Sequence, residues 1–212
     1  MVSSRTENVV KNAWFALITQ IIDILLSLIS RTAFIYMLGV EYLGVNGLFT
    51  NILALLSFAE LGIGNAIIYS LYKPLAVKDK EKIRQLMSLY AKAYKLIGIF
   101  IFVSGLLVIP FINYIIKDPP NIKENIYLIY LLFLLNTSLS YFYVYKKSII
   151  IADQKSYIVS IYRQMFHIAQ VVTQILFLLL TREYIVFLLL QIMYTIMNNI
   201  ATSRKADKMY PF

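Results

Sequence analysis

An all-α membrane protein that crosses the bilayer six times is predicted by the hydropathy, the charge content and the length of the uncharged stretches. Of 212 residues, 60% are hydrophobic and 15% are charged, and the mean hydropathy is +0.72. Soluble domains carry about 25% charged residues. Five stretches contain no Asp, Glu, Lys or Arg over 18 to 21 residues, close to the roughly 20 apolar residues that one spanning helix needs. They are 42–59, 96–116, 125–145, 164–181 and 184–203.

The sixth apolar region, residues 12–38, is interrupted only by Asp23 and Arg31. Helices are expected throughout, because the bilayer core offers open backbone groups no hydrogen-bonding partner. Together the spans form one transmembrane domain over residues 1–212, which leaves no room for a separate globular domain. The expected spans are 11–38, 43–72, 86–117, 123–151, 156–180 and 184–203.

Lysine and arginine are distributed unevenly between alternate connections. One set of connections, together with both termini, carries 13 of the 20 basic residues, whereas the opposite set carries only Lys117, Lys123 and Arg182. Because basic loops stay on the cytoplasmic side, both termini are expected to be cytoplasmic. The net charge of +9 is therefore interpreted as attraction to anionic membrane lipid and not as nucleic-acid binding.

An enzyme with a cofactor or a metal is not expected. The chain has no cysteine and one histidine, so neither a thiolate site nor a multi-histidine zinc site can form. A G-x-x-x-x-G-K-[ST] phosphate-binding loop is also absent from the sequence. A transporter must therefore use an ion gradient or removal of the product as its driving force.

Ionisable residues inside the spans are the candidate functional residues, because a charge in the bilayer core is costly and faces protein or water. Asp23, Glu60 and His167 are expected within roughly 3 Å of the bilayer centre, and we assign them to ion coupling. Arg31 and Arg163 are expected about 9 Å and 7 Å to either side. We assign the two arginines to substrate binding, because a guanidinium suits a diphosphate.

Structural explanations of the same residues stay open. Asp23, Glu60 and the arginines could form a salt-bridge network, and His167 could be a hydrogen-bonded packing residue. The Asn, Gln, Ser and Thr side chains on the first, second, fifth and sixth spans could simply join helices. The transport reading requires instead that Asp23, Glu60 and Arg31 converge on one hydrated cleft.

Residues 31–76, RTAFIYMLGVEYLGVNGLFTNILALLSFAELGIGNAIIYSLYKPLA, resemble the N-terminal part of Wzx-type polysaccharide flippases. This family belongs to the multidrug/oligosaccharidyl-lipid/polysaccharide (MOP) exporter superfamily. Shorter similarities follow in IIADQKSY (150–157) and NNIATSRKADKMYPF (198–212). The resemblance implies one six-helix lobe of a two-lobed, MATE-like transporter in a bacterial-type plasma membrane. It also implies that undecaprenyl-diphosphate-linked oligosaccharide repeat units are flipped to the outer leaflet, with Arg31 the best match to a diphosphate-binding residue.

Family members are roughly twice as long, so the resemblance implies that the C-terminal lobe is missing here. The expected partners are the lipid-linked oligosaccharide, membrane lipid, and either a separate second lobe or a second, parallel copy of this chain. Two alternatives stay open: a cation-coupled exporter of drug-like small molecules, and a truncated remnant that does not transport.

Overall fold

The computed structural model of this chain describes residues 5–60, 62–116 and 120–211, which are almost entirely helical and contain no strand. Five helical segments are long and apolar enough to cross a membrane. Ile126–Ser140 and Tyr145–Ala152 pass the same test together with a bend of 44° between them, which gives six spans if this pair counts as one. The predicted all-α polytopic membrane architecture is confirmed. The helices are α1 Arg5–Leu38, α2 Val40–Ser57, α3 Ile63–Ala76, α4 Lys80–Val108, α5 Ile112–Ile115, α6 Ile126–Ser140, α7 Tyr145–Ala152, α8 Ser156–Thr181 and α9 Tyr184–Met209.

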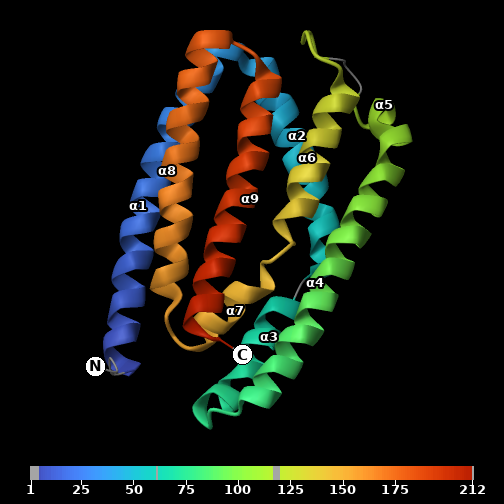
Figure 1. Cartoon of the computed structure of the whole chain (residues 1–212). Coiled ribbons are helices and arrows are strands. Elements are labelled where there is room, and N and C mark those ends of the chain that lie inside the picture. The colour runs from blue at the N-terminus through green and yellow to red at the C-terminus, as the bar shows by residue number, and fades with distance from the viewer. Residues whose placement is uncertain (1–4, 61, 117–119, 212) are drawn as a thin grey trace.

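The connections alternate between the two ends of the bundle (Figure 1). Both termini, the α3–α4 turn and the α7–α8 turn lie at one end, which we call the basic end because it carries most of the lysines and arginines. The α1–α2 and α8–α9 turns and the start of α6 lie at the opposite end, which we call the far end. The loops of the two sets predicted from the sequence are thus separated along the bundle axis.

The helix expected over 43–72 is interrupted. It consists of α2, the short 3-10 helix η1 (Phe58–Glu60) and α3. Gly62 immediately precedes α3 with φ 87°, in the left-handed region that glycine adopts without steric cost. The second expected span is therefore interrupted at η1, which contains Glu60.

The helix expected over 123–151 is also interrupted, between α6 and α7. Tyr143 has φ 67° at this break, a conformation that is uncommon for a residue with a side chain. The other four expected ranges correspond to α1, to α4 with its short extension through α5, to α8 and to α9. Residue 117, the expected end of the third span, lies outside the described residues.

Two apolar cores lie along the bundle, and the two helix breaks fall between them. The core nearer the far end contains Phe49, Tyr130 and Leu134, which are fully buried. The core nearer the basic end contains Leu71 and Ile150 and joins α3, α4 and α7. Each broken span therefore contributes one half to each core, and Leu56, just before the first break, packs against both.

Helix α4 packs closely against α6 through glycine. The Ser138 hydroxyl donates to the Gly98 carbonyl oxygen at 2.8 Å, and the Tyr130 hydroxyl donates to the Gly105 carbonyl oxygen at the same distance. A Cβ at Gly98 would lie 3.3 Å from the Ser138 carbonyl oxygen. Small residues at such positions let transmembrane helices approach closely enough for van der Waals packing and for these hydrogen bonds.

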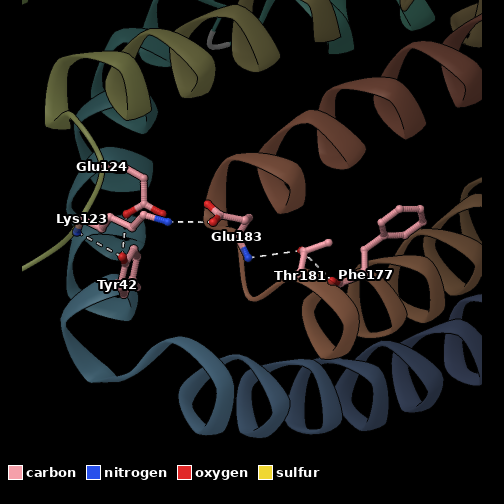
Figure 2. Close-up of polar contacts among 6 residues, drawn as sticks. All are labelled: Tyr42, Lys123, Glu124, Phe177, Thr181 and Glu183. Atoms are coloured by element: carbon pink, nitrogen blue, oxygen red, sulfur yellow. Dashed lines mark hydrogen bonds and ion pairs between the residues drawn. The ribbon is translucent and has the colours of Figure 1, made fainter.

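Polar contacts join three connections at the far end (Figure 2). Lys123 Nζ forms an ion pair with Glu183 Oε1 at 2.8 Å, which links the start of α6 to the α8–α9 turn. The Tyr42 hydroxyl donates to Glu124 Oε2 at 2.6 Å and accepts from the Lys123 backbone N–H at 3.3 Å, which adds α2 to the network. Thr181 Oγ1 accepts from the Glu183 backbone N–H. These contacts hold the far ends of α2, α6, α8 and α9 together.

Candidate functional site

A polar cavity of about 480 Å³ lies where the two helix breaks face α8 and α9. We call it the main cavity. Its volume falls within the range of about 300–1,000 Å³ typical of small-molecule sites. It is lined by Glu60, Tyr94, Ser140, Tyr141, Val144, Lys147, Arg163, Phe166, His167, Gln170, Tyr194, Thr195, Asn198 and Asn199.

One wall of the main cavity is built around Glu60. The break after α2 places this carboxylate in η1, where it faces α4 instead of continuing along a helix. The Tyr94 hydroxyl of α4 donates to Glu60 Oε1 at 2.9 Å, and the Tyr94 ring stacks on the Tyr141 ring at 6.4 Å between centroids. Glu60 is thereby held at the cavity by an aromatic pair from two other helices.

Asp23, Arg163 and His167 form a cluster, of which Arg163 and His167 line the main cavity from α8. Arg163 and His167 are four residues apart, so they occupy the same face of α8. Arg163 Nη2 lies 2.9 Å from Asp23 Oδ2, and His167 Nδ1 lies 2.9 Å from Asp23 Oδ1. Since an ionised carboxylate only accepts hydrogen bonds, both α8 side chains donate to Asp23. Asp23 thus joins α1 to the cavity-lining face of α8.

Lys147 brings a second cation to the main cavity. It lies on α7, just after the second break, and its ammonium interacts electrostatically with Glu60 and Arg163. Lys147 falls inside the fourth expected span, 123–151, and was not among the predicted site residues. The break directs it inward. The neighbouring Lys146 does not line the main cavity and forms an ion pair with Asp207 at 2.6 Å.

Amide side chains of α9 complete the site. Asn199 Nδ2 donates to the backbone oxygens of Ser140 at 3.0 Å and Phe142 at 3.3 Å. Asn198 Oδ1 is buried and lacks a hydrogen-bond partner within the described residues. Thr195 and Asn198 line the cavity beside Asn199, and none of the three was among the predicted site residues. The cavity therefore combines cations, carboxylates and neutral hydrogen-bonding groups.

The candidate residues predicted from the sequence are only partly brought together. Glu60, Arg163 and His167 line the main cavity, and Asp23 contacts the two α8 residues from outside its lining. Arg31 is exposed on α1, does not line the main cavity and forms no ion pair within the described residues. The convergence of Asp23, Glu60 and Arg31 on one cleft, which the transport reading required, is therefore not observed. A transport site in this fold would have to use Arg163 and Lys147 as its cavity cations in place of Arg31.

Within the part of the chain that the structure describes, no group of three or more His, Asp or Glu side chains could hold a metal ion. The main cavity can bind a polar molecule. Its cations can contact anionic groups, and its amides and hydroxyls can form hydrogen bonds with neutral polar groups. The fold and this cavity define the chain as a polytopic membrane protein with a polar site inside its helical bundle. In comparisons with known proteins, the chain matches no family model, no curated protein and no solved structure.

Proposed function

We propose that the chain is one lobe of a transporter that flips undecaprenyl-diphosphate-linked oligosaccharide repeat units by alternating access, as in Wzx-type polysaccharide export. The observation that carries this proposal is the main cavity, in which Arg163 and Lys147 accompany amide and hydroxyl groups inside an otherwise apolar bundle. A diphosphate needs cations and a sugar needs neutral donors and acceptors. The buried, unpartnered Asn198 Oδ1 adds an unused acceptor for a sugar hydroxyl.

Ion coupling is assigned to Asp23, Glu60 and His167 in this proposal. Carboxylates and imidazoles are the groups that relay protons inside membranes. His167 contacts both Asp23 and the cavity, so a proton bound at this histidine would alter the Asp23–Arg163 pair. In the proposed cycle, release of Arg163 from Asp23 makes its guanidinium available to the diphosphate.

A second six-helix unit is part of the proposal, either a separate lobe or a parallel second copy. Gln20, Ser27 and Arg31 are all exposed on α1, and their spacing of seven and four residues places them on one helix face. An exposed arginine within a span is costly next to lipid. A partner unit that covers this face would bring Arg31 to the diphosphate from the α1 side, as the family resemblance implies.

The proposed orientation has both termini in the cytoplasm of a bacterial-type cell. The basic end carries the Lys- and Arg-rich connections, and such connections remain on the cytoplasmic side. The main cavity would then receive the head group from the inner leaflet, while the far-end contacts around Lys123 and Tyr42 keep the outer side closed.

Binding of a prenyl-diphosphate disaccharide to the chain in lipid nanodiscs tests this function. We expect Arg163→Gln and Lys147→Gln each to raise the Kd about tenfold, because one charge-assisted contact contributes about 1.5–3 kcal/mol. Arg204→Gln is the matched control, since Arg204 is exposed near the end of α9 and does not line the cavity. Absence of binding in the parent chain would refute the proposal. Binding of lipophilic cations in its place would favour the small-molecule exporter.

A further inference from the structure

Two hollows lie along the line of contact between α4 and α7, which we call the α4–α7 seam. The hollow nearer the basic end has a volume of about 390 Å³, with Arg84 and Lys146 in its lining. The second has a volume of about 310 Å³ and is lined mainly by aromatic side chains together with Lys95. Ala91 and Tyr145 line both hollows, so the two follow each other along the seam.

The stacked Tyr94–Tyr141 pair separates the second hollow from the main cavity. Both tyrosines line both spaces, and only 4% of Tyr94 and 8% of Tyr141 is exposed. The hydrogen bond from Tyr94 to Glu60 holds the pair from the cavity side. Rotation of one tyrosine ring would therefore connect the α4–α7 seam to the polar site.

The seam has the chemistry of a surface that faces lipid head groups. Arg84 and Lys95 are exposed cations in its lining, and the uncharged stretch of α4 begins directly after Lys95. Cations at this depth attract anionic lipid. Beyond Lys95, α4 exposes apolar side chains on which a hydrocarbon chain can lie. These are Leu96, Ile99, Phe100 and Val103.

We infer that the α4–α7 seam is the lateral route by which the anionic head group of a membrane lipid reaches the main cavity. Tyr94 and Tyr141 form the gate between the seam and this cavity. This inference rests on the proposed function, because it supplies an access route for the substrate of that function. The phosphate passes Arg84 and Lys95 while the chain stays in hydrocarbon along α4. The head group therefore never has to cross the apolar core of the bilayer before it binds.

Cysteine labelling can follow this route, because the natural chain contains no cysteine. Thr195→Cys places one thiol in the main cavity, and its reaction rate with a small methanethiosulfonate is measured in nanodiscs after addition of dodecyl phosphate. We expect the lipid to slow labelling about tenfold, and inorganic phosphate to have no such effect. Adding Ala91→Trp, which fills the seam, should delay the onset of protection about tenfold without changing its final level.

Leu89→Trp is the matched control for Ala91→Trp. Leu89 lies at the same depth of α4, is 59% exposed and lines none of these hollows, so the onset of protection should be unchanged. Tyr94→Ala should hasten the onset, whereas Tyr94→Phe, which keeps the ring, should stay closer to the parent.

Three results would overturn the inference, and they are distinguishable from each other. If dodecyl phosphate does not protect the parent thiol, the proposed function itself fails. If protection occurs but its onset is equally fast, or equally delayed, in Ala91→Trp and Leu89→Trp, the lipid reaches the cavity by another route and only the seam is refuted. If inorganic phosphate protects as well as dodecyl phosphate, the site binds free anions and no lipid route is needed.

Discussion

Asn199 of α9 donates a hydrogen bond to the backbone oxygen of Ser140, at the point where α6 ends. The break between α6 and α7 removes the usual helical partners of the carbonyl groups at this point, and the membrane interior has no water to replace them. The second bond from Asn199, to the Phe142 carbonyl oxygen, supports the same break. The bend that places Lys147 in the main cavity thus depends on one amide from another helix.

Replacing Asn199 by leucine should destabilise the bundle. The Ser140 and Phe142 carbonyl groups would lose their partner, and an unsatisfied buried polar group costs about 1–3 kcal/mol. The free energy of unfolding measured by SDS titration in mixed micelles checks this expectation. Gln20→Leu makes the same kind of change on the exposed face of α1 and should leave the bundle as stable as the parent or more so. Equal stability of Asn199→Leu and the parent would show that the break does not need this amide.

Adding one methyl group at Gly98 should loosen the contact between α4 and α6. The new Cβ would lie 3.3 Å from the backbone oxygen of Ser138, and backbone moves less easily than the end of a side chain. Such overpacking costs about 1–3 kcal/mol. Gly47→Ala is the control, because no atom lies within 4 Å of a Cβ there and alanine favours the helix by about 1 kcal/mol. A thermal shift in the same direction for both variants would contradict this packing argument.

The number of spans and the alternation of the connections could be predicted, because both depend on composition along the chain. The first helix break also has a signal in the sequence, since Gly62 lies inside the expected span 43–72. In the structure Gly62 adopts φ 87°. The second break has no such signal. Tyr143 is neither glycine nor proline, and the conformation at Tyr143 is stabilised by tertiary contacts such as those of Asn199. Contacts between helices that are distant in the chain cannot be predicted from a single sequence.

The position of Arg31 shows why the expected cleft did not form. Asp23 and Arg31 are eight residues apart on α1. An α-helix turns about 100° per residue, so eight residues rotate the side chain by about 80°. Asp23 therefore faces α8, where it contacts Arg163, while Arg31 lies on the flank of α1 and is exposed. Helix geometry alone gives this divergence, whereas the pairing with α8 required the structure.

Asp23→Asn should weaken the contact between α1 and α8. Asparagine keeps the shape of the side chain but not its charge, so Arg163 and His167 lose a charge-assisted acceptor that contributes about 1.5–3 kcal/mol. A double-mutant cycle of Asp23→Asn with His167→Gln, followed by SDS unfolding, should give a coupling energy of about 0.5–3 kcal/mol. Arg31→Gln on the same helix should leave the stability of the isolated chain unchanged. Strictly additive effects in the cycle would mean that the carboxylate and the imidazole act independently.

Ionisation of Tyr210 should lower the stability of the bundle as the pH rises above about 10. Burial, together with the hydrogen bond that its hydroxyl donates to Asp153 at 2.7 Å, raises the pKa of this tyrosine from its ordinary value of 10.0. The folded chain therefore keeps the phenol proton after the unfolded chain has lost it, so the stabilisation is complete below pH 10 and declines above it. One proton accounts for at most about 1.4 kcal/mol per pH unit, and partial exposure of the ring lowers this slope.

Tyr210→Phe isolates this contribution from the other tyrosines and lysines that ionise in the same range. The variant should be less stable than the parent at pH 8, where Asp153 loses the hydrogen bond from Tyr210 and keeps its ion pair with Lys155 at 2.5 Å. The difference between the two proteins should shrink as the pH rises, because only the parent loses the stabilisation by Tyr210. Thermal unfolding in detergent between pH 8 and 11 measures both curves. Parallel curves over this range would show that the phenol of Tyr210 is not coupled to folding.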